Sequence, residues 1–474
     1  MRYTFHLKTL AVAVATLSVA SVASAAGLDR SGQDITAFLQ DGTYAEAVYT
    51  YIDADVTGYD NAYVGSDNKA YTQGKKIDDI AESYDFFRYG VKTDINDTFS
   101  VGILYDEPFG AAADYTGNNN FVTNDDADAL IQGFTGNLGL NEGLVDQNIT
   151  DLKGALAPGN PGNFSPEQLQ EFQGQLIGLE AAKGLAATAG ETTQVEVRTE
   201  SITGIFGAKF GQNKEFQAYG GPVAQRVQAD VKLRGTAYSA ASGYTTHINP
   251  DQDYGWIAGM SYSKPEIALK AALTYRSEIK HDAKAFEVFP IATAAGARAG
   301  LTLPTTRYAD IEINTPESVN LDFQTGINPT TLVTAKVRWV PWSDFAITPS
   351  LYNDVSKVST QDDDGLALVS YDDDQWQVEL GLAKRLAPVL AVSGTVGWDS
   401  GAGNPVTSLG PTEGYYSAGL GAKYNVTENW AVSAGGKYLW LGDAKGQIPN
   451  KAIVSDFESN DGFVLGVKVS YQAQ

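Results

Sequence analysis

Residues 461–472 read Asp-Gly-Phe-Val-Leu-Gly-Val-Lys-Val-Ser-Tyr-Gln, and this stretch decides the fold class. Successive side chains of a strand point to opposite faces. One face therefore carries Phe463, Leu465, Val467, Val469 and Tyr471, and the other carries Val464, Gly466, Lys468 and Ser470. The same alternation recurs along almost the whole chain. An apolar face toward lipid and a polar face toward a lumen explain it, so the sequence predicts an all-β, transmembrane antiparallel β-barrel.

Lysine and arginine occupy one face of several alternating segments whose other face is apolar, notably residues 227–234, 267–276 and 333–339. Such a strand cannot lie between two dry layers. We expect the apolar faces to meet lipid and the charged faces to line the lumen. For residues 227–234, this places Val227, Ala229, Val231 and Leu233 outside, and Asp230, Lys232 and Arg234 inside.

Short turns and long polar connections alternate along the chain. The turns are at residues 94–97, 211–214, 263–265, 326–329, 385–388 and 425–429, and the longer connections are near 53–83, 107–199, 235–252, 281–315, 354–373, 400–413 and 442–460. This rhythm is typical of a barrel with tight periplasmic turns and long external loops, and it gives about fourteen strands if residues 331–353 form one strand. An even number of strands places both termini on the periplasmic side.

The first 25 residues have the features of a secretory signal peptide. Arg2 and Lys8 precede an apolar run over residues 10–20, and Ala23-Ser24-Ala25 supplies a cleavage site. No later segment approaches the roughly 20 apolar residues of a spanning helix. Residues 26–43 then precede the first strand, either as a hatch in the barrel or as a periplasmic tail, and residues 44–474 form the predicted barrel.

The composition excludes several classes of function. The formal charge is -24, and loss of Arg2 and Lys8 makes it -26, which argues against nucleic acid as a partner because phosphate binding needs clustered cations. There is no Cys, and His247 and His281, the two His outside the signal, lie in expected loops. No nucleophile–base motif and no ordered metal-ligand spacing is present, so we predict no enzyme, no cofactor and no metal site.

The longest connection, about residues 107–199, contains the helical signals. Ser165 is the expected N-cap, with Pro166 at the first helical position. An apolar face follows, made of Leu169, Phe172, Leu176 and Leu179. Residues 126–156 are also helical in tendency. An amphipathic pair outside the barrel is either a lid packed on neighbouring loops or the lip of a hydrophobic capture groove.

Several segments resemble the FadL/TodX family of outer-membrane transporters for long-chain fatty acids and other hydrophobic compounds. The most specific are Thr274-Tyr275-Arg276-Ser277-Glu278 and Trp339-Val340-Pro341-Trp342-Ser343. Residues 99–110, 256–260, 315–319, 414–420 and 441–445 extend the likeness, which spans residues 26–474 in register. It implies a barrel of about fourteen strands with an N-terminal hatch. Residues 26–43 contain no Pro and so lack the Asn-Pro-Ala motif that family members commonly carry there.

The resemblance implies passive uptake of long-chain fatty acids or similar hydrophobic molecules in the bacterial outer membrane. We expect a monomer in contact with membrane lipid and lipopolysaccharide. A carboxylate head needs a cation, and the alternation offers Arg234, Arg276 and Lys232 as the best candidates for the lumen. Lumen cations also pair with neighbouring acids, so structural pairing is the competing reading for each.

Pro108, Phe109 and Gly110 interrupt the expected third strand, because Pro donates no ladder bond and Gly permits a bulge. This break is either the end of the strand or a kink that opens a sideways exit to the lipid. The resemblance favours the exit.

Three other functions remain open. A general diffusion porin for small polar solutes would need an open lumen, against which residues 26–43 and the charged lumen face argue. An adhesin or surface receptor would use the acidic loops and the helical insertion. Within the family, aromatic hydrocarbons are an alternative substrate, and nothing in the sequence separates them from fatty acids.

Overall fold

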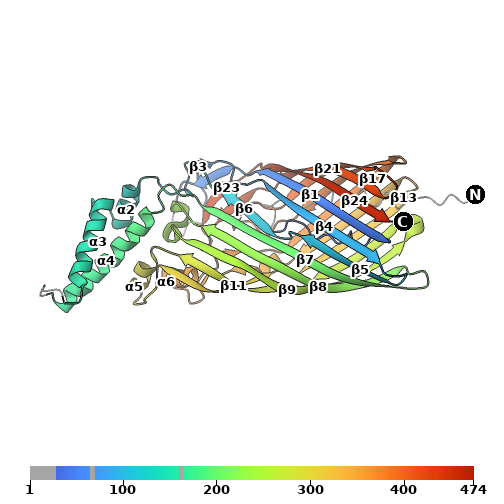
Figure 1. Cartoon of the computed structure of the whole chain (residues 1–474). Coiled ribbons are helices and arrows are strands. Elements are labelled where there is room, and N and C mark those ends of the chain that lie inside the picture. The colour runs from blue at the N-terminus through green and yellow to red at the C-terminus, as the bar shows by residue number, and fades with distance from the viewer. Residues whose placement is uncertain (1–27, 65–69, 160–161, 163, 474) are drawn as a thin grey trace, which may run out of the picture.

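The computed structural model describes residues 28–64, 70–159, 162 and 164–473, so the expected signal peptide lies outside the described residues. Its main sheet has 17 strand segments and is closed, because β1 (Thr43–Asp55) pairs with both β4 (Tyr84–Asp94) and β24 (Asp461–Ala473) (Figure 1). Three of the barrel strands are each split into two segments, which leaves fourteen antiparallel strands. The predicted fold class and strand number are confirmed.

The remaining barrel strands follow in chain order. They are β5 (Phe99–Asp106) with β6 (Gly110–Asp114), β7 (Gln194–Phe210), β8 (Phe216–Lys232), β9 (Thr245–Lys264), β10 (Leu269–Arg276) with β11 (Ile279–Val288), β12 (Thr306–Thr315) with β13 (Ser318–Asn328), β14 (Thr331–Val340), β17 (Gln375–Ala387), β18 (Leu390–Asp399), β20 (Tyr415–Asn425) and β21 (Trp430–Leu441).

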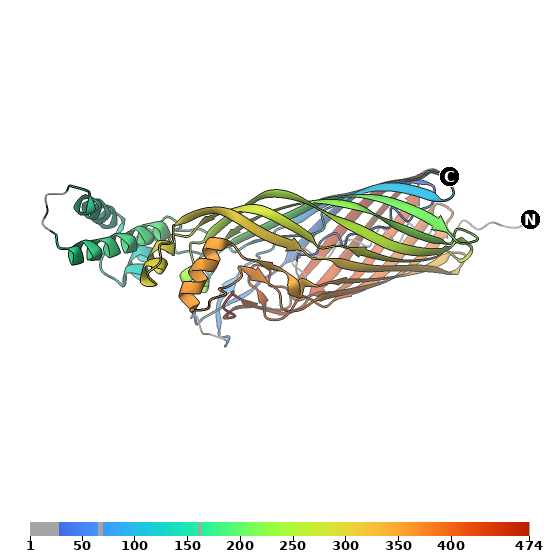
Figure 2. The same cartoon turned by 90° about the horizontal axis from the view of Figure 1, so that it is seen from below.

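The short turns lie at one end of the barrel, where β24 also ends, and the helices lie at the opposite end (Figures 1 and 2). We refer to these as the periplasmic and the extracellular end. A second sheet of five short strands belongs to the extracellular loops: β2 (Gly58–Asn61), β3 (Gln73–Ile77), β19 (Val406–Thr407), β22 (Ala444–Gln447) and β23 (Ile453–Phe457). Smaller elements there are η1 (Thr236–Ala241), α5 (Ala292–Arg298) and β16 (Val369–Ser370).

Residues 331–353 are not one strand, so that prediction is wrong. β14 stops at Val340 and is followed by η3 (Trp342–Asp344), β15 (Ala346–Ile347) and α6 (Ser350–Thr360). Pro341 cannot donate to a ladder. The Trp342 side chain turns into the core, fully buried, and its Nε1 donates to Gln375 Oε1 at 2.9 Å. The barrel count is unaffected because β14 pairs with β17 up to Val340.

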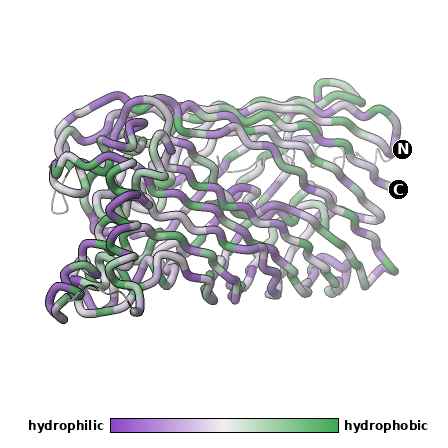
Figure 3. The backbone as a smooth tube through the Cα atoms, turned by 60° about the vertical axis from the view of Figure 1, so that its left-hand side comes forward, coloured by the Kyte–Doolittle hydropathy of each residue, from purple (hydrophilic) through white to green (hydrophobic). Residues whose placement is uncertain are grey.

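The outward face of the strands changes character along its length. On β7, Ile202 and Phe206 are 54% and 50% exposed in the apolar belt, whereas Arg198 and Glu200 occupy the same face nearer the extracellular end. Apolar and polar residues alternate along the strands in Figure 3. Above the belt the outer medium is water, so the apolar face turns inward and joins a large core that includes Phe121.

The predicted facing of residues 227–233 is therefore reversed, whereas Arg234 is buried, as expected. Val227, Ala229, Val231 and Leu233 are buried inside, and Asp230 and Lys232 face outward. The predicted alternation of the side chains is correct. However, a two-residue periodicity identifies only which residues share a face, and it does not identify the medium that this face contacts.

Three helices form the insertion between the third and fourth barrel strands: α2 (Ala127–Thr135), α3 (Glu142–Leu156) and α4 (Pro166–Ala186). Ser165 caps α4 with a capping box to Gln168, and Pro166 is its first residue, as predicted. The insertion is shorter than residues 107–199, because β6 and the start of β7 lie within that range. No helix in the described ranges is both long and apolar enough to cross a membrane.

Candidate ligand pocket and wall opening

The described residues before β1 lie inside the barrel. We call residues 28–42 the hatch, and charged side chains of the wall hold it. Asp29 receives two bonds from Arg338, at 2.7 Å from Nε and 2.9 Å from Nη2, and both side chains are buried. Asp34 lies 3.3 Å from Arg88, and Lys270 Nζ donates to the Leu39 carbonyl. The sequence left the choice between plug and periplasmic tail open, and these contacts place the chain in the lumen.

The hatch also bonds to the interruption in the third strand. Gly110 N donates to the Leu28 carbonyl at 2.7 Å, and Arg30 N donates to the Pro108 carbonyl at 2.8 Å. Asp29 and Phe109 form an antiparallel bridge between these bonds. The Gly110 amide and the Pro108 carbonyl have no strand partner in the described wall at the break, and the hatch supplies their hydrogen-bond partners instead.

The break leaves an unpaired stretch between β4 and the third barrel strand. The β4–β5 ladder ends at the pair Tyr89 and Tyr105, and pairing resumes only at the bridge between Ala81 and Ala113. Between these points, residues 83–88 form no backbone bond to residues 106–111 in the described structure. We call this stretch the third-strand window.

Arg30 fills the third-strand window from the inside. Its guanidinium lies 3.3 Å from the centre of the Tyr84 ring, the side chain is fully buried, and none of its three nitrogens has a hydrogen-bond partner among the described residues. A Cβ at Gly110 would come within 2.6 Å of the guanidinium carbon, so a larger residue there would displace the end of the Arg30 side chain. The sequence analysis does not predict Arg30 as a site residue. The feature that could have pointed to it is that Arg30 is the one cation in residues 26–43.

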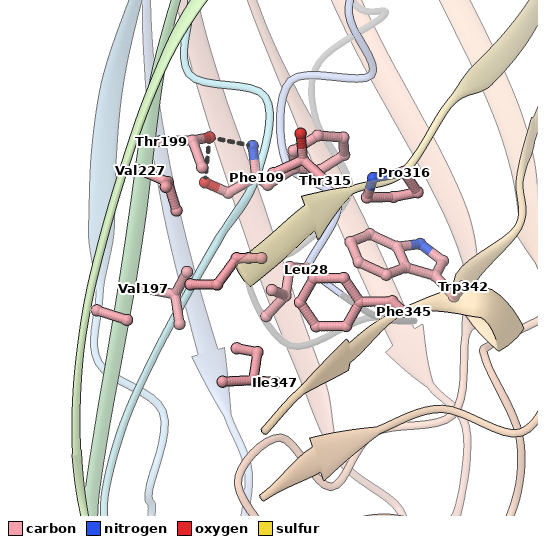
Figure 4. Close-up of a pocket in the computed structure, with 12 residues that line it drawn as sticks. Leu28, Phe109, Val197, Thr199, Val227, Thr315, Pro316, Trp342, Phe345 and Ile347 are labelled. Atoms are coloured by element: carbon pink, nitrogen blue, oxygen red, sulfur yellow. Dashed lines mark hydrogen bonds between the residues drawn. The ribbon is translucent and has the colours of Figure 1, made fainter. Parts of the chain in front are cut away.

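An apolar pocket lies behind this window (Figure 4). Phe109 from the break forms one side, and its ring meets Trp342 edge-on with the centroids 5.5 Å apart. Thr199 Oγ1 accepts a bond from Phe109 N at 2.8 Å and donates to the Phe109 carbonyl at 2.7 Å, which fixes this wall. The other lining residues are Leu28, Val197, Val227, Ala229, Ile313, Thr315, Pro316, Phe345 and Ile347. The free space suits an apolar ligand but holds about one water-sized sphere, so a larger ligand must displace side chains.

The three predicted carboxylate-binding cations have different environments. Arg234 has a structural role, because it donates hydrogen bonds to Glu191 at 2.6 Å, to the Tyr244 carbonyl at 2.6 Å and to Thr245 at 2.7 Å. Lys232 faces outward, as described above, and does not reach the lumen. The expected lumen position of Lys232 is therefore wrong.

Arg276 does lie in the lumen. It is buried on β10, and its Nη1 donates to Thr203 Oγ1 at 3.0 Å, while Nε and Nη2 have no hydrogen-bond partner in the part of the chain that the structure describes. Of the three candidates, Arg276 is the one with donors left for an anionic head group.

The proposed capture face of α4 is mostly turned toward the other helices. Leu176 and Leu179 pack against a small core formed by Ile131, Val145, Ile149 and Ala186. Phe172 meets Phe164 edge-on at 5.2 Å, and Leu169 is exposed. The face therefore holds the three helices together and leaves little apolar surface for a groove.

The two His are in strands and not in loops, which corrects their expected location. His247 lies on β9, with Nδ1 2.6 Å from Asp230, and His281 is buried on β11. Their ring nitrogens contact Asp230 in the case of His247, and Gln225 and Asp251 in the case of His281. No group of three potential metal ligands occurs in the part of the chain that the structure describes.

Comparison with solved structures shows the same fold in proteins of low sequence identity. A FadL homologue of Pseudomonas aeruginosa is 14% identical with a TM-score of 0.62, and the alignment covers 98% of this chain and 96% of that one. The toluene transporter TodX of P. putida is 10% identical with a TM-score of 0.51, covering 92% and 91%. The toluene transporter TbuX of Ralstonia pickettii is 9% identical with a TM-score of 0.50, covering 97% and 98%. No curated protein sequence matches the chain.

The sequence comparison agrees with the fold. Residues 208–472, more than half of the chain, match the family model described as outer membrane protein transport protein (OMPP1/FadL/TodX). The predicted resemblance is confirmed, and with it the assignment to transport proteins of the outer membrane. The chain belongs to the OMPP1/FadL/TodX family of outer-membrane transport proteins.

Proposed function

We propose that this protein takes up long-chain fatty acids or similar hydrophobic molecules passively and releases them sideways through the third-strand window. The observation that carries the proposal is the position of the apolar pocket. Phe109 belongs both to the pocket wall and to the interruption that leaves residues 83–88 without a ladder to the third strand. Phe109, Leu28 and Arg30 therefore lie between a ligand in the pocket and the third-strand window.

Solvation supplies the driving force. Each buried CH2 contributes about 0.8 kcal/mol, so an acyl chain or an aromatic ring prefers an apolar site to the aqueous lumen. The bilayer offers still more apolar surface, so transfer from pocket to lipid is downhill. No energy source is needed.

The level of the window supports release into the membrane. Its lower edge is the pair Tyr89 and Tyr105, whose rings face outward with centroids 5.7 Å apart. Aromatic residues mark the membrane interface of such barrels. A molecule leaving at this level meets the outer leaflet without crossing polar lumen water.

Two substrate classes remain. Arg276, with two unused donors in the lumen, favours a carboxylate and so a fatty acid. The small aromatic-lined pocket, and the likeness in fold to solved toluene transporters, favour aromatic hydrocarbons. A general porin is disfavoured, because the hatch fills the lumen with buried ion pairs.

Uptake in cells that lack related transporters tests the proposal. We expect the protein to restore entrance of labelled oleate or toluene, and unchanged uptake of both would overturn it. A cysteine pair tests the route, since the chain has no Cys of its own. Ser31 Oγ donates to Asp106 Oδ2 at 3.0 Å, so S31C with D106C can lock the hatch to the third strand. The oxidised protein should lose uptake, and the same protein after reduction is the matched control.

If the oxidised and reduced forms transport equally well, the hatch does not have to move and the ligand leaves elsewhere. Heat-modifiable migration of the barrel on gels reports that the variant is folded. Capture at the extracellular end, contact with lipid and lipopolysaccharide, and action as a monomer are parts of the same proposal.

A further inference from the structure

The barrel wall has a second unpaired stretch, between the sixth and seventh barrel strands. β9 pairs with β10 from Lys264 to Ile257 and with β11 from Ile248 to Thr245. Between these ladders, residues 249–255 form no backbone bond to residues 278–284 in the described structure. Trp256 and Ser277 close the lower end, with two bonds of 3.0 Å. We call this stretch the β9–β11 window.

Two bulges at different positions explain why the ladder fails here. On β9, the inward positions change from Thr246 and Ile248 to Asp251 and Asp253, and the β8–β9 register shifts at the same place. On the seventh strand, the inward positions change between Arg276 and Ile279. Each change inserts one residue, as a β-bulge does.

The register on both sides of the window is nevertheless continuous: Ile257 opposes Arg276, and Ile248 opposes Ala285. Continued through the window, that register would place Asp253 opposite Lys280. Asp253 faces inward and Lys280 faces outward. Opposed residues of an antiparallel pair must share a face, so the ladder cannot form between the two bulges.

The outer rim of the window is polar and aromatic. Tyr254 and Trp256 are 67% and 52% exposed, and the Trp256 ring lies 5.1 Å from Tyr275. On the other side, Lys280 pairs with Glu312 at 2.5 Å. Unpaired backbone groups do not occur against hydrocarbon, so the window faces the head-group layer above the apolar belt.

Three buried side chains in hydrogen-bond contact connect this window with the pocket. His281 points inward, with Nδ1 3.4 Å from Asp251 and Nε2 3.2 Å from Gln225 Oε1. Thr315 Oγ1 donates to the same Gln225 oxygen at 2.6 Å. Thr315 lines the apolar pocket. The path from the window to the pocket is thus His281, Gln225 and Thr315.

We propose that the β9–β11 window is a second lateral portal, through which an uncharged hydrophobic molecule enters the pocket from the head-group layer, with His281 as the side chain that closes it. The inference rests on the proposed function. Asp251, Asp253, Glu278 and Asp282 line the window, whereas its cations, Lys280 and Lys284, are each paired with a β12 carboxylate. An acidic rim repels carboxylates, so the portal selects neutral molecules such as aromatic hydrocarbons.

A reversible cross-link tests this portal. In D251C with H281C, a short bis-thiosulfonate reagent joins the two strands across the window, and reduction releases them. The control pair is A383C with S393C, which are directly paired in the intact β17–β18 ladder. We expect the first cross-link to slow toluene entrance at least tenfold, with oleate uptake changed less than twofold. The control cross-link should change neither.

Hydrogen exchange gives a second measurement on the unmodified protein. The amides of residues 249–255 and 278–284 that point into the window should exchange faster than those of the adjoining ladders. Toluene entrance that is equal before and after cross-linking, or amides as protected as in β17–β18, would overturn the portal. If the lock at residues 31 and 106 still stops uptake, the proposed function stands without the second portal; if the unlocked protein transports nothing, the proposed function itself fails.

Discussion

Arg30 stacks on Tyr84, and its guanidinium nitrogens make no hydrogen bond within the described chain, whereas Arg338 makes two bonds to Asp29, one to Gln33 and one to Asn320. A desolvated cation–π contact contributes about 2 kcal/mol. Breaking a buried ion pair by removal of one partner costs about 3–5 kcal/mol. The hatch is therefore held by the buried ion pairs of Asp29 and Asp34, and Arg30 makes a weaker contact at the third-strand window.

Replacing Arg30 by Ala should empty the third-strand window while leaving the Asp29 contact intact. We expect faster uptake of hydrophobic probes and greater sensitivity to hydrophobic antibiotics, because the side chain that blocks the exit is gone. Arg30→Lys keeps the charge but loses the flat stacking surface, so its effect should be intermediate. Uptake rates equal to the unmodified protein in both variants would show that Arg30 does not obstruct the route.

Arg338→Met should loosen the hatch as a whole. Loss of the two bonds to Asp29 disfavours docking by about 3–5 kcal/mol, so residues 28–42 should become sensitive to protease from the periplasmic side and channel conductance should rise. The double variant D29L with R338M is the matched control, because it removes the buried charge together with its partner and should regain most of the docking. Similar proteolysis in the two variants would contradict an ion-pair latch.

At the scale of elements, the third barrel strand shows why the two residues of its interruption are not equivalent. Pro108 withholds a ladder donor, but its carbonyl is already used by the hatch. Gly110 leaves room for Arg30, because the guanidinium of Arg30 occupies the space of a Cβ. Substituting both together would combine opposite effects.

Pro108→Thr should therefore slow release, since it supplies an amide donor toward β4 and favours a closed wall. Gly110→Ala should instead push Arg30 aside and speed release. Pro388→Thr, in the turn between β17 and β18, is the control with no expected effect on transport. Efflux of a preloaded fluorescent fatty acid into lipid vesicles distinguishes the three, and a change of the same sign in P108T and G110A would contradict the assignment.

The elements were predictable where local rules decide them. Alternation and turn residues fixed the strands and the periplasmic turns, and Ser165 with Pro166 fixed the start of α4. The failures come from the surroundings of the chain. Lys232 faces outward because the strands continue beyond the bilayer, and Trp342 leaves the wall because its ring finds a buried partner. The role of Arg30 could not be predicted from periodicity. The conformation of the hatch depends on the surrounding barrel wall, and its residues form no regular strand or helix.

At the scale of the whole molecule, two windows interrupt the pairing of neighbouring strands in the described wall, and the same pocket lies behind both. Phe109 connects it to the third-strand window, and Thr315 connects it to the β9–β11 window through Gln225. The belt of outward apolar residues fixes both windows at the membrane surface. On the proposed route, a hydrophobic molecule passes from one side of the head-group layer to another, and the extracellular mouth is not its sole approach.

The three-helix insertion should be dispensable for this route. Its core is made of its own residues, and the chain enters and leaves it side by side: Gly190 N donates to the Asn124 carbonyl at 3.1 Å, and Val122 bridges Thr192. Residues 125–189 can therefore be replaced by an Asn-Gly hairpin turn without disturbing Glu191, which holds Arg234. We expect an intact barrel and a half-saturating ligand concentration within twofold of the full protein, measured by uptake at graded oleate and toluene concentrations. A tenfold rise in that concentration would contradict this expectation. It would show that α4 captures the ligand, with Leu169 and Phe172 as its binding residues.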